Sequence, residues 1–429
     1  MTDEGRQLYA PELPGGVLVK IFSGLASSNP DSVRDLCAAA SVCPSWREAA
    51  KEPCLWHMLS VREAPLNARL TGPRLRNLIA RSCNTLSWLL LVGCPLVNDV
   101  MLALPLQQQP CLLCVSVTDC ALVTRPGLAY ALCDAEDFQG IVEQLNNPRQ
   151  SAADAQRCCV ALRTLLDAAE DDATLPEARA AGALDALLHC ANKHTAHAGV
   201  QAACCWALSE YVCVAEDTNL ASYPPTFQAA VAALKAHPLY CYVQGPALFA
   251  VYNVCFFGLA ATHGVPALLD AIQPVLAALR AFPTDLEVQL CGCSSLTLMC
   301  GMDASVAEAV AAAGALGLFI KALNLDVKNE VALSAAIDAI GAIALSKAAL
   351  PQASACISAL LSALRRYEKI SGVAVAACKT LGCYLRCPAT RQRALLSWAD
   401  SAIRATCTAH STNEAVKKAA ADALKAPHA

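Results

Sequence analysis

The chain has 429 residues, with 36 acidic and 32 basic side chains and a formal net charge of −4. Hydrophobic residues make up 56% of the chain and charged residues only 16%, a balance that excludes an intrinsically disordered protein. Aromatic residues reach just 5%, so alanine and leucine supply most of the apolar surface. This composition favours helices packed through small side chains, and the length allows roughly two to four domains.

The 25 cysteines indicate the cellular compartment. Many lie inside apolar helical patterns, and some are adjacent, as in Cys158-Cys159 and Cys204-Cys205. This placement is typical of reduced, buried thiols, whereas disulfide-rich secreted scaffolds are much shorter. The N-terminus also lacks the basic-then-apolar pattern of a signal peptide. We therefore expect a cytoplasmic or nuclear protein.

The first predicted elements are three short helices within residues 9–60. Pro14 suits the first turn of a helix, where its missing N–H is not needed. After it, apolar side chains recur at helical spacing: Val17, Leu18, Ile21, Phe22 and Leu25. A second helix follows around Trp46, and Leu55-Trp56 begins a third. A module this small gains from burying apolar surface against a partner.

These residues resemble an F-box in both order and spacing. The matching positions are Leu13-Pro14, Val17-Leu18, Ile21-Phe22, Leu25, Asp35-Leu36, Val42-Cys43, Trp46-Arg47 and Leu55-Trp56. The resemblance implies a three-helix module that docks its protein onto the Skp-type adaptor of a cullin ubiquitin ligase. It assigns adaptor binding to Leu13, Pro14, Val17, Leu18, Ile21, Phe22, Leu25 and Trp46. The alternative is an ordinary small helical cap whose aromatic side chains form its own core.

Two features depart from the usual F-box pattern. Gly15-Gly16 stands where acidic or helix-favouring residues are usual, and each glycine costs roughly 1 kcal/mol of helix propensity relative to alanine. Residues 27–32 lengthen the first connection, which loops tolerate well. Neither feature removes an adaptor-contacting position, but both bear on the affinity for the adaptor.

Residues 61–133 carry a repeat with a period of 26 residues. The alignment pairs Leu89 with Val115, Leu91 with Val117 and Cys94 with Cys120. The pattern resembles the cysteine-containing leucine-rich repeat, in which a short strand precedes a buried cysteine and a helix. It implies about two and a half repeats, with residues 68–83 as the helical half of an earlier copy and with Cys94 and Cys120 as core thiols.

A second repeat system occupies residues 134–427. A recurring long helix sets its phase, and equivalent positions in it are held by Gln156, Gln201, Gln244, Gln289, Ala332, Ala374 and Val416. Their spacing of 42 to 45 residues, with shorter helical segments in between, resembles armadillo repeats. About seven copies would form an α-solenoid with a groove lined by the third helix of each repeat. HEAT-like repeats are the neighbouring alternative.

The order of F-box, leucine-rich repeats and armadillo repeats resembles the Arabidillo-type F-box proteins. The expected fold class is therefore mainly α, with an N-terminal three-helix F-box, a short leucine-rich repeat element and an armadillo-type α-solenoid. The repeat resemblance implies a fold and not a ligand.

Charge is distributed unevenly along the predicted solenoid. Residues 134–217 hold 14 acidic and 5 basic residues, whereas residues 361–429 hold 4 acidic and 11 basic residues. The basic end comprises Arg365, Arg366, Lys369, Lys379, Arg386, Arg391, Arg393, Arg404, Lys417 and Lys418. It is either an ordinary solvated solenoid end or a docking site for an acidic partner segment. Aromatic residues are not interleaved with these cations, which argues against nucleic-acid binding.

Importin-type armadillo grooves carry a Trp-x-x-x-Asn pattern, which offers a comparison for the third helices. Trp206 is followed by Glu210, and the next repeat has Phe249 and Asn253 at the matching positions. The remaining repeats lack the pattern, so a nuclear-import receptor is disfavoured. Trp206, Glu210, Phe249 and Asn253 are the predicted peptide-contacting positions of the groove. The alternative is that Trp206 and Phe249 belong to the core.

The sequence predicts no catalytic, cofactor or metal site. It contains no Gly-rich phosphate loop, His-Glu metal helix or nucleophile elbow. Cys111 and Cys114 form a Cys-x-x-Cys pair, but no second pair stands at zinc-finger spacing. His189, His194 and His197 lack a fixed companion carboxylate.

We therefore expect a non-catalytic receptor subunit of a Skp-cullin-F-box ubiquitin ligase. Its F-box would bind the Skp-type adaptor, and through it the cullin and RING subunits, while the armadillo groove holds a protein substrate. No nucleic-acid partner is expected. No membrane partner is expected either, because Pro246 should interrupt a helix over the long uncharged stretch 238–261. One alternative is an armadillo scaffold or regulatory protein whose F-box does not act in a ligase. Another is an adaptor-bound regulator that turns over no client.

Overall fold

The structure is a computed structural model that divides into two compact units, residues 1–190 and residues 191–429. The helical part is described over residues 137–167, 174–215, 220–257, 264–324 and 329–425. The preceding part is described at Trp56, 58–61, 70–81, 86, 88–92, 94–98, 101–102 and 114–118. The predicted F-box helices fall almost entirely outside these residues.

Unit 1 contains a small parallel sheet in the order β1-β2-β3. Its strands are Met58–Val61, Trp88–Val92 and Cys114–Thr118. Leu89 pairs with Val115 and Leu91 with Val117, so the strands follow the register that the 26-residue alignment predicts. Leu59, Leu89 and Val115 form one buried row across the sheet. Leu59 and Val61 of β1, like Leu89 and Leu91 of β2, point into the core at alternate positions.

The elements around the sheet agree with the repeat alignment, except that strand β1 lies close to where the third F-box helix was expected. Helix α4 (Gly72–Arg81) lies within the segment expected to be helical, and Cys94 is fully buried as predicted, whereas Cys120 lies outside the described residues. The sequence pattern placed a third F-box helix from Leu55-Trp56 onward. The structure instead has strand β1 from Met58, because buried Leu59 and Val61 alternate with a period of two.

Among the described residues of unit 1, four helices follow the sheet: α7 (Phe138–Leu145), α8 (Ala152–Asp167), α9 (Thr174–Ala180) and most of α10 (Ala183–Lys193). The carboxylate of Asp137 caps α7 by accepting from the Gly140 N–H at 2.8 Å. Helix α8 contacts β3, so the sheet and the first helices share one core. The division between the units falls within α10.

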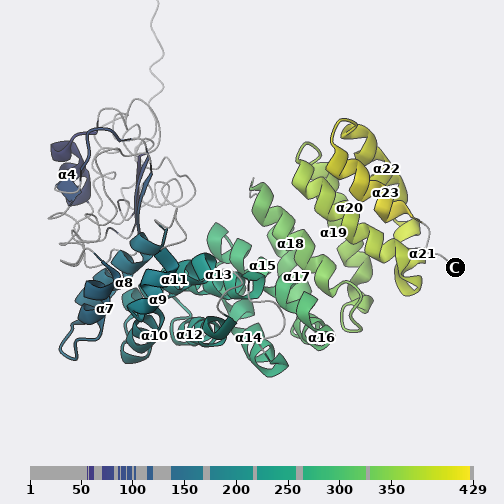
Figure 1. The fold of residues 1–429 in the computed structure, drawn as a ribbon. Helices are drawn as coiled ribbons and strands as arrows, with labels where there is room; N and C mark the ends of the chain where they lie inside the picture. The colour runs from purple at the N-terminus through teal and green to yellow at the C-terminus, as the bar shows by residue number, and fades with distance from the viewer. Residues whose placement is uncertain are drawn as a thin grey trace, which may run out of the picture. The chain divides into compact units, whose positions relative to one another are not determined.

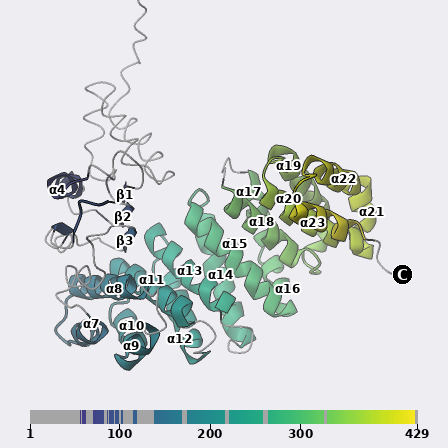
Figure 2. The same ribbon diagram turned by 45° about the horizontal axis from the view of Figure 1, so that its top comes forward.

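Unit 2 is built from helices in two layers (Figures 1 and 2). One layer contains the long third helices, each contacting the next: α11 (Ala198–Ala215), α13 (Cys241–Phe257), α15 (Leu286–Met302), α18 (Glu330–Ile343), α20 (Ser371–Arg386) and α23 (Glu414–Leu424). The other contains the second helices: α12 (Tyr223–Ala236), α14 (Val265–Ala281), α17 (Ala315–Asn324), α19 (Ala353–Arg366) and α22 (Ala399–Ala409). This arrangement is a helical, solenoid-like fold, as the 42-to-45-residue period predicts.

The first helix of the repeat varies along the chain. It is a regular helix at α9, α16 (Ala304–Ala312) and α21 (Pro388–Leu396). In two other repeats the described residues of this segment form a 3₁₀ turn, η4 (Leu220–Ser222) and η5 (Leu350–Gln352). The second and third helices are therefore the constant part of the unit.

The glutamines that mark the repeat phase have a structural role. The Gln244 side-chain amide donates to the carbonyls of Leu234 and His237, at 3.1 and 3.0 Å. Gln201 and Gln289 make the equivalent pair of bonds, each to the carbonyls ten and seven residues earlier. Each third helix thereby satisfies carbonyls at the end of the second helix, which lack partners within that helix.

Polar residues fix where the third helices begin. Asp285, Asn329 and Asn413 are the N-caps of α15, α18 and α23, and each accepts from a backbone N–H of the first turn.

Helices α20 and α23 approach each other closely at Gly382, where an added Cβ would lie 2.7 Å from the Cα of Ala423. Small residues therefore set the spacing of this layer.

Candidate functional site

The eight predicted adaptor-binding residues lie outside the described part of the structure. They are Leu13, Pro14, Val17, Leu18, Ile21, Phe22, Leu25 and Trp46. The neighbouring Trp56 is described and is only 1% exposed. The guanidinium carbon of Arg81, at the end of α4, lies 5.0 Å from the centre of its ring. This cation–π contact connects the end of the predicted F-box to the first strand–helix unit.

An aromatic row runs from α11 along α13. The rings of Trp206 and Phe249 are 5.3 Å apart, followed by Phe249–Tyr252 at 6.3 Å and Tyr252–Phe256 at 5.8 Å. The last three residues are spaced three and four apart, so they share one face of α13. Trp206 is buried, Phe249 and Tyr252 are half-buried, and Phe256 is 56% exposed. The row therefore passes from the core to the surface.

Asn253 points into the helix interface beside this row. It is 2% exposed, and its amide donates to the Ser209 carbonyl at 3.4 Å and to the Cys213 sulfur at 3.0 Å. Glu210 is half-buried on α11, and its charge adds to the burial that raises the pKa of Cys213 to about 12. The structure thus brings Trp206 and Phe249 together and engages Asn253 within the chain. Peptide contact by these four residues stays a prediction.

The Trp-x-x-x-Asn pattern does not point to Tyr252 or Phe256. That pattern covers only two positions of each third helix and leaves out the rest of the helix face. The spacing of Phe249, Tyr252 and Phe256 is the signal that could have found them.

Two neighbouring cavities lie on the third-helix layer near the C-terminus. One, of about 290 Å³, is lined by Glu330 and Asp338 of α18 and by Lys379 of α20, among others. The other, of about 340 Å³, is lined by Lys379, Arg386 and Lys418, with an apolar floor that includes Ala415 and Ala419. Lys379 and Val375 line both cavities. The surface changes from acidic at α18 to basic at α20 and α23.

The acidic side chains on this surface are held in different ways. The Glu330 carboxylate accepts from the Gly372 N–H at 2.7 Å. Burial raises the pKa of Asp338, an effect that the positive charge of Lys379 opposes. The hydrogen bond from Lys425 lowers the pKa of Asp422. Asp422 therefore carries its charge at neutral pH and forms its salt bridge with Lys425. Lys379 and Lys418 form no salt bridge within residues 329–425, although their charges act on Asp338 and Asp422.

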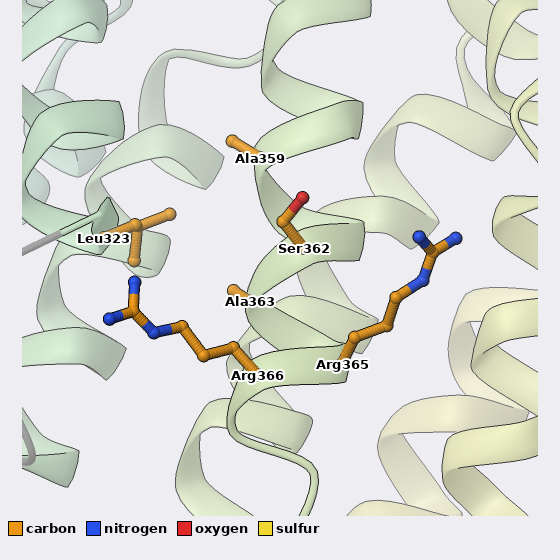
Figure 3. A pocket seen from close by; sticks show the side chains of 6 residues that line it. All are labelled: Leu323, Ala359, Ser362, Ala363, Arg365 and Arg366. Atoms are coloured by element: carbon orange, nitrogen blue, oxygen red, sulfur yellow. The ribbon is translucent and has the colours of Figure 1, made fainter. Parts of the chain in front are cut away.

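A third cavity, of about 400 Å³, lies on the second-helix layer between α17 and α19 (Figure 3). Arg366 reaches across it toward Leu323, whereas Arg365 extends to the other side of α19 (Figure 3). The guanidinium of Arg366 also lies over the ring of Tyr367 at 5.5 Å. The basic residues of the C-terminal part thus divide between the two layers, which the sequence did not resolve.

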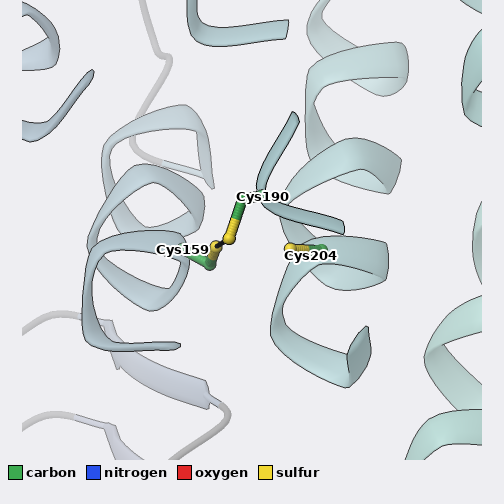
Figure 4. Close-up of side chains that lie close together, drawn as sticks. All are labelled: Cys159, Cys190 and Cys204. Carbon is green, nitrogen blue, oxygen red and sulfur yellow. Dashed lines mark hydrogen bonds between the residues drawn. The ribbon is translucent and has the colours of Figure 1, made fainter. Parts of the chain in front are cut away.

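Most cysteines of the described residues are buried like apolar side chains, whereas Cys241 is exposed. In unit 1 the sulfur atoms of Cys159 and Cys190 are 3.8 Å apart in the core (Figure 4). Burial raises the pKa of Cys205, Cys255 and Cys293 to about 12. These thiols stay protonated at neutral pH and are poor nucleophiles.

No single helix among the described residues is long and apolar enough to cross a membrane. The prediction that Pro246 interrupts a helix is wrong, because Pro246 lies inside the helix α13. Helices α16 and α17 reach the required length and apolarity only as a pair, and they are bent by 76° at the break between them.

Comparison with known proteins identifies one segment and one fold. Residues 10–62 match the family model described as F-box-like. No curated protein matches the chain. An engineered protein solved by crystallography, Northeast Structural Genomics Consortium target OR497, has a TM-score of 0.55 at 16% identity over 95% of this chain and 98% of its own. A second, target OR329, has a TM-score of 0.42 at 17% identity over 67% and 94%.

The first of these structures shows the fold alone, because its sequence is so distant. The second is too dissimilar to support an argument. The chain thus carries an F-box-like segment at its N-terminus and a mostly helical, solenoid-like fold.

Proposed function

We propose that this chain is the substrate-recognition subunit of a Skp-cullin-F-box ubiquitin ligase. The F-box-like segment binds the Skp-type adaptor, which links it to the cullin and RING subunits, and the helical array binds a protein client. The observation that carries the proposal is the F-box-like match at residues 10–62, which contains all eight predicted adaptor-binding residues. F-box modules generally serve as adaptor-docking segments.

The proposal assigns residues 61–133 to leucine-rich repeats and residues 134–427 to armadillo repeats. Support for the first comes from the parallel register of β1 to β3 and from the buried Cys94. Support for the second comes from units of a short, a second and a long third helix, as in α16, α17 and α18. An array of this kind offers an extended surface to a protein ligand.

The client surface in this proposal is the third-helix layer. The aromatic row ending at exposed Phe256 offers apolar contact, and the cavities around Lys379, Arg386 and Lys418 offer cations. Aromatic and arginine side chains supply most of the binding energy in protein interfaces. The receptor performs no chemistry itself in this role but raises the local concentration of client near the carrier enzyme. It acts in the cytoplasm, the nucleus or both.

Co-purification with the Skp-type adaptor and the cullin tests the proposal. The full chain should capture both proteins, and the Phe22→Ala variant should lose both. A Phe256→Ala variant is the matched control, since it removes an exposed ring outside residues 10–62 and should retain the adaptor. Intact chain that never captures the adaptor, with Phe22→Ala behaving identically, would favour a scaffold or regulatory role outside a ligase.

Client turnover is tested separately by depleting the chain and measuring which proteins accumulate. Proteins that accumulate and also bind the wild-type chain but not Phe256→Ala are the expected clients. Adaptor capture without any accumulating protein would instead support a regulator that turns over no client.

A further inference from the structure

The connection between α21 and α22 passes through a residue in the left-handed conformation. Trp398 has φ 61° and ψ 31°, and it is the one non-glycine residue with positive φ in the described part of the chain. At the corresponding turn, between a first and a second helix, Gly182 has φ 75° and Gly314 has φ 79°. The left-handed conformation is sterically unfavourable for a residue that carries a side chain, whereas glycine adopts it readily.

The three turns have the same hydrogen bonds, so the tryptophan side chain is not needed to make the turn. The N–H of Trp398 donates to the Leu395 carbonyl at 3.0 Å, as Gly182 does to Arg179 and Gly314 to Ala311. Glycine at 398 would keep this bond and remove the steric cost. The sequence therefore retains an aromatic residue at a position where the backbone favours glycine.

Packing within the described chain does not account for this choice. Trp398 is 73% exposed, and the adjacent Leu395 and Leu396 are 45% and 74% exposed. The core contacts of this turn are made by Ala394 and Ala399, which are fully buried. Three large apolar side chains within four residues thus form an exposed ledge, defined here as Leu395, Leu396 and Trp398. A strained backbone that presents an exposed ring points to a contact with another molecule.

The charges around the ledge indicate the chemistry of that molecule. Arg391 and Arg393 lie on α21 and Arg404 on α22, all exposed, and Asp400 is the one acidic residue of residues 388–409. The Arg393 guanidinium donates to the Leu350 carbonyl at 3.2 Å, which fixes its position beside the turn. The surface is therefore apolar with a basic margin. Lipid-binding patches usually gather roughly 4–8 cations, more than the three found here.

We propose that the ledge binds an amphipathic, acidic segment of a partner protein, with Trp398 as the anchor. Leu395 and Leu396 would cover apolar side chains of that segment, while Arg391 and Arg404 would face its carboxylates. Tryptophan and arginine are the side chains most enriched at binding hot spots. The site lies on the first and second helices, away from the third-helix surface assigned to the client, and it does not depend on the F-box function.

The test uses the full-length chain and a display library of short random peptides. Peptides selected on the wild-type chain are compared with those that still bind Trp398→Gly. Trp398-dependent peptides should combine leucine or phenylalanine with aspartate or glutamate. Their affinity for Trp398→Gly should fall roughly thirtyfold, the loss expected for a hot-spot tryptophan. The charge-reversed Arg391→Glu and Arg404→Glu variants should also weaken them.

Thermal unfolding separates binding from folding. Trp398→Gly should unfold at the same or a higher temperature than the wild type, because the left-handed strain is relieved. The control variant Leu239→Ala removes an equally exposed side chain elsewhere and should bind the selected peptides normally. A less stable Trp398→Gly would overturn the inference, because the ring would then belong to the fold. Trp398-dependent peptides without acidic residues would overturn it too, as would an absence of such peptides or Trp398-dependent binding to phosphatidylserine vesicles alone.

Discussion

The side-chain amide of Gln244 donates to the carbonyls of His237 and Leu234. One side chain of α13 thus binds two carbonyls at the C-terminal end of α12 and holds the two helices together. Gln244 is 1% exposed, and water cannot replace these bonds. Because both carbonyls would lose a buried donor, Gln244→Ala should lower the free energy of unfolding by about 1–3 kcal/mol. Urea unfolding followed by circular dichroism measures this loss.

Gln228 provides the matched control for that variant. It lies on the exposed face of α12, and Gln228→Ala should change the unfolding free energy by less than about 0.5 kcal/mol. Equal effects of the two substitutions would show that the amide bonds contribute nothing beyond side-chain removal.

Gly382 allows α20 and α23 to pack closely. A Cβ at this position would lie 2.7 Å from the Ala423 Cα and 2.8 Å from its Cβ, so Gly382→Ala must push the two helices apart. We expect a loss of about 1–3 kcal/mol. Gly317→Ala in α17 meets no atom within 4 Å and should instead be neutral or stabilise by up to about 1 kcal/mol. Thermal melting of both variants checks the opposite signs.

Buried thiols should make the protein sensitive to alkali. Burial raises the pKa of Cys205, Cys255 and Cys293 from 9.0 to about 12, so the folded chain keeps protons that the unfolded chain releases above pH 9. The stabilisation of the fold by these protonated thiols is fully present below pH 9 and is lost between pH 9 and 12. Stability should therefore fall by about 1.4 kcal/mol per pH unit for each thiol in that range.

Urea unfolding at pH 7, 9 and 10 measures this slope. Lysine and tyrosine titration also affects stability at high pH, so the informative quantity is the difference between wild type and Cys205→Ala. The variant should lose stability less steeply above pH 9. Parallel curves of unfolding free energy against pH for the two proteins would show that Cys205 has the same pKa in the folded and the unfolded chain.

Asn253 and Phe256 should separate fold from binding on helix α13. Asn253 is buried and bonded to α11, so Asn253→Ala should lower the unfolding free energy by about 1–3 kcal/mol. Phe256 is largely exposed, so Phe256→Ala should leave stability nearly unchanged while weakening client capture. Unfolding curves and client pull-downs on both variants distinguish the two roles, and a Phe256→Ala protein that unfolds early would assign this ring to the core.

Periodicity explains what could be predicted from the sequence. The 26-residue alignment placed Leu89 opposite Val115, and the strands pair in that register because side chains on a parallel sheet repeat in rows. The recurring glutamines gave the phase of the third helices, although nothing local showed that Gln244 reaches back to His237. That bond depends on how two helices pack, which one helix's pattern does not contain.

Other features depended on tertiary context. Pro351 and Pro388 both stand at the start of a first-helix segment, yet one begins a single 3₁₀ turn and the other a helix. The cavity shared by Lys379 and Lys418 arises because α20 and α23 are neighbours, while their residue numbers lie far apart. The sequence does not reveal the left-handed backbone or the exposed ring of Trp398, because both depend on the turn between α21 and α22.

The variable first helix has a consequence for how such a chain can evolve. Where η4 or η5 replaces a helix, the second and third helices on either side still pack in their layers. Surface connections of this kind tolerate insertions and deletions because the packed core does not depend on their length. A change of length at one connection would leave the packed second and third helices in place, whereas a changed length inside a third helix would shift every side chain that follows it.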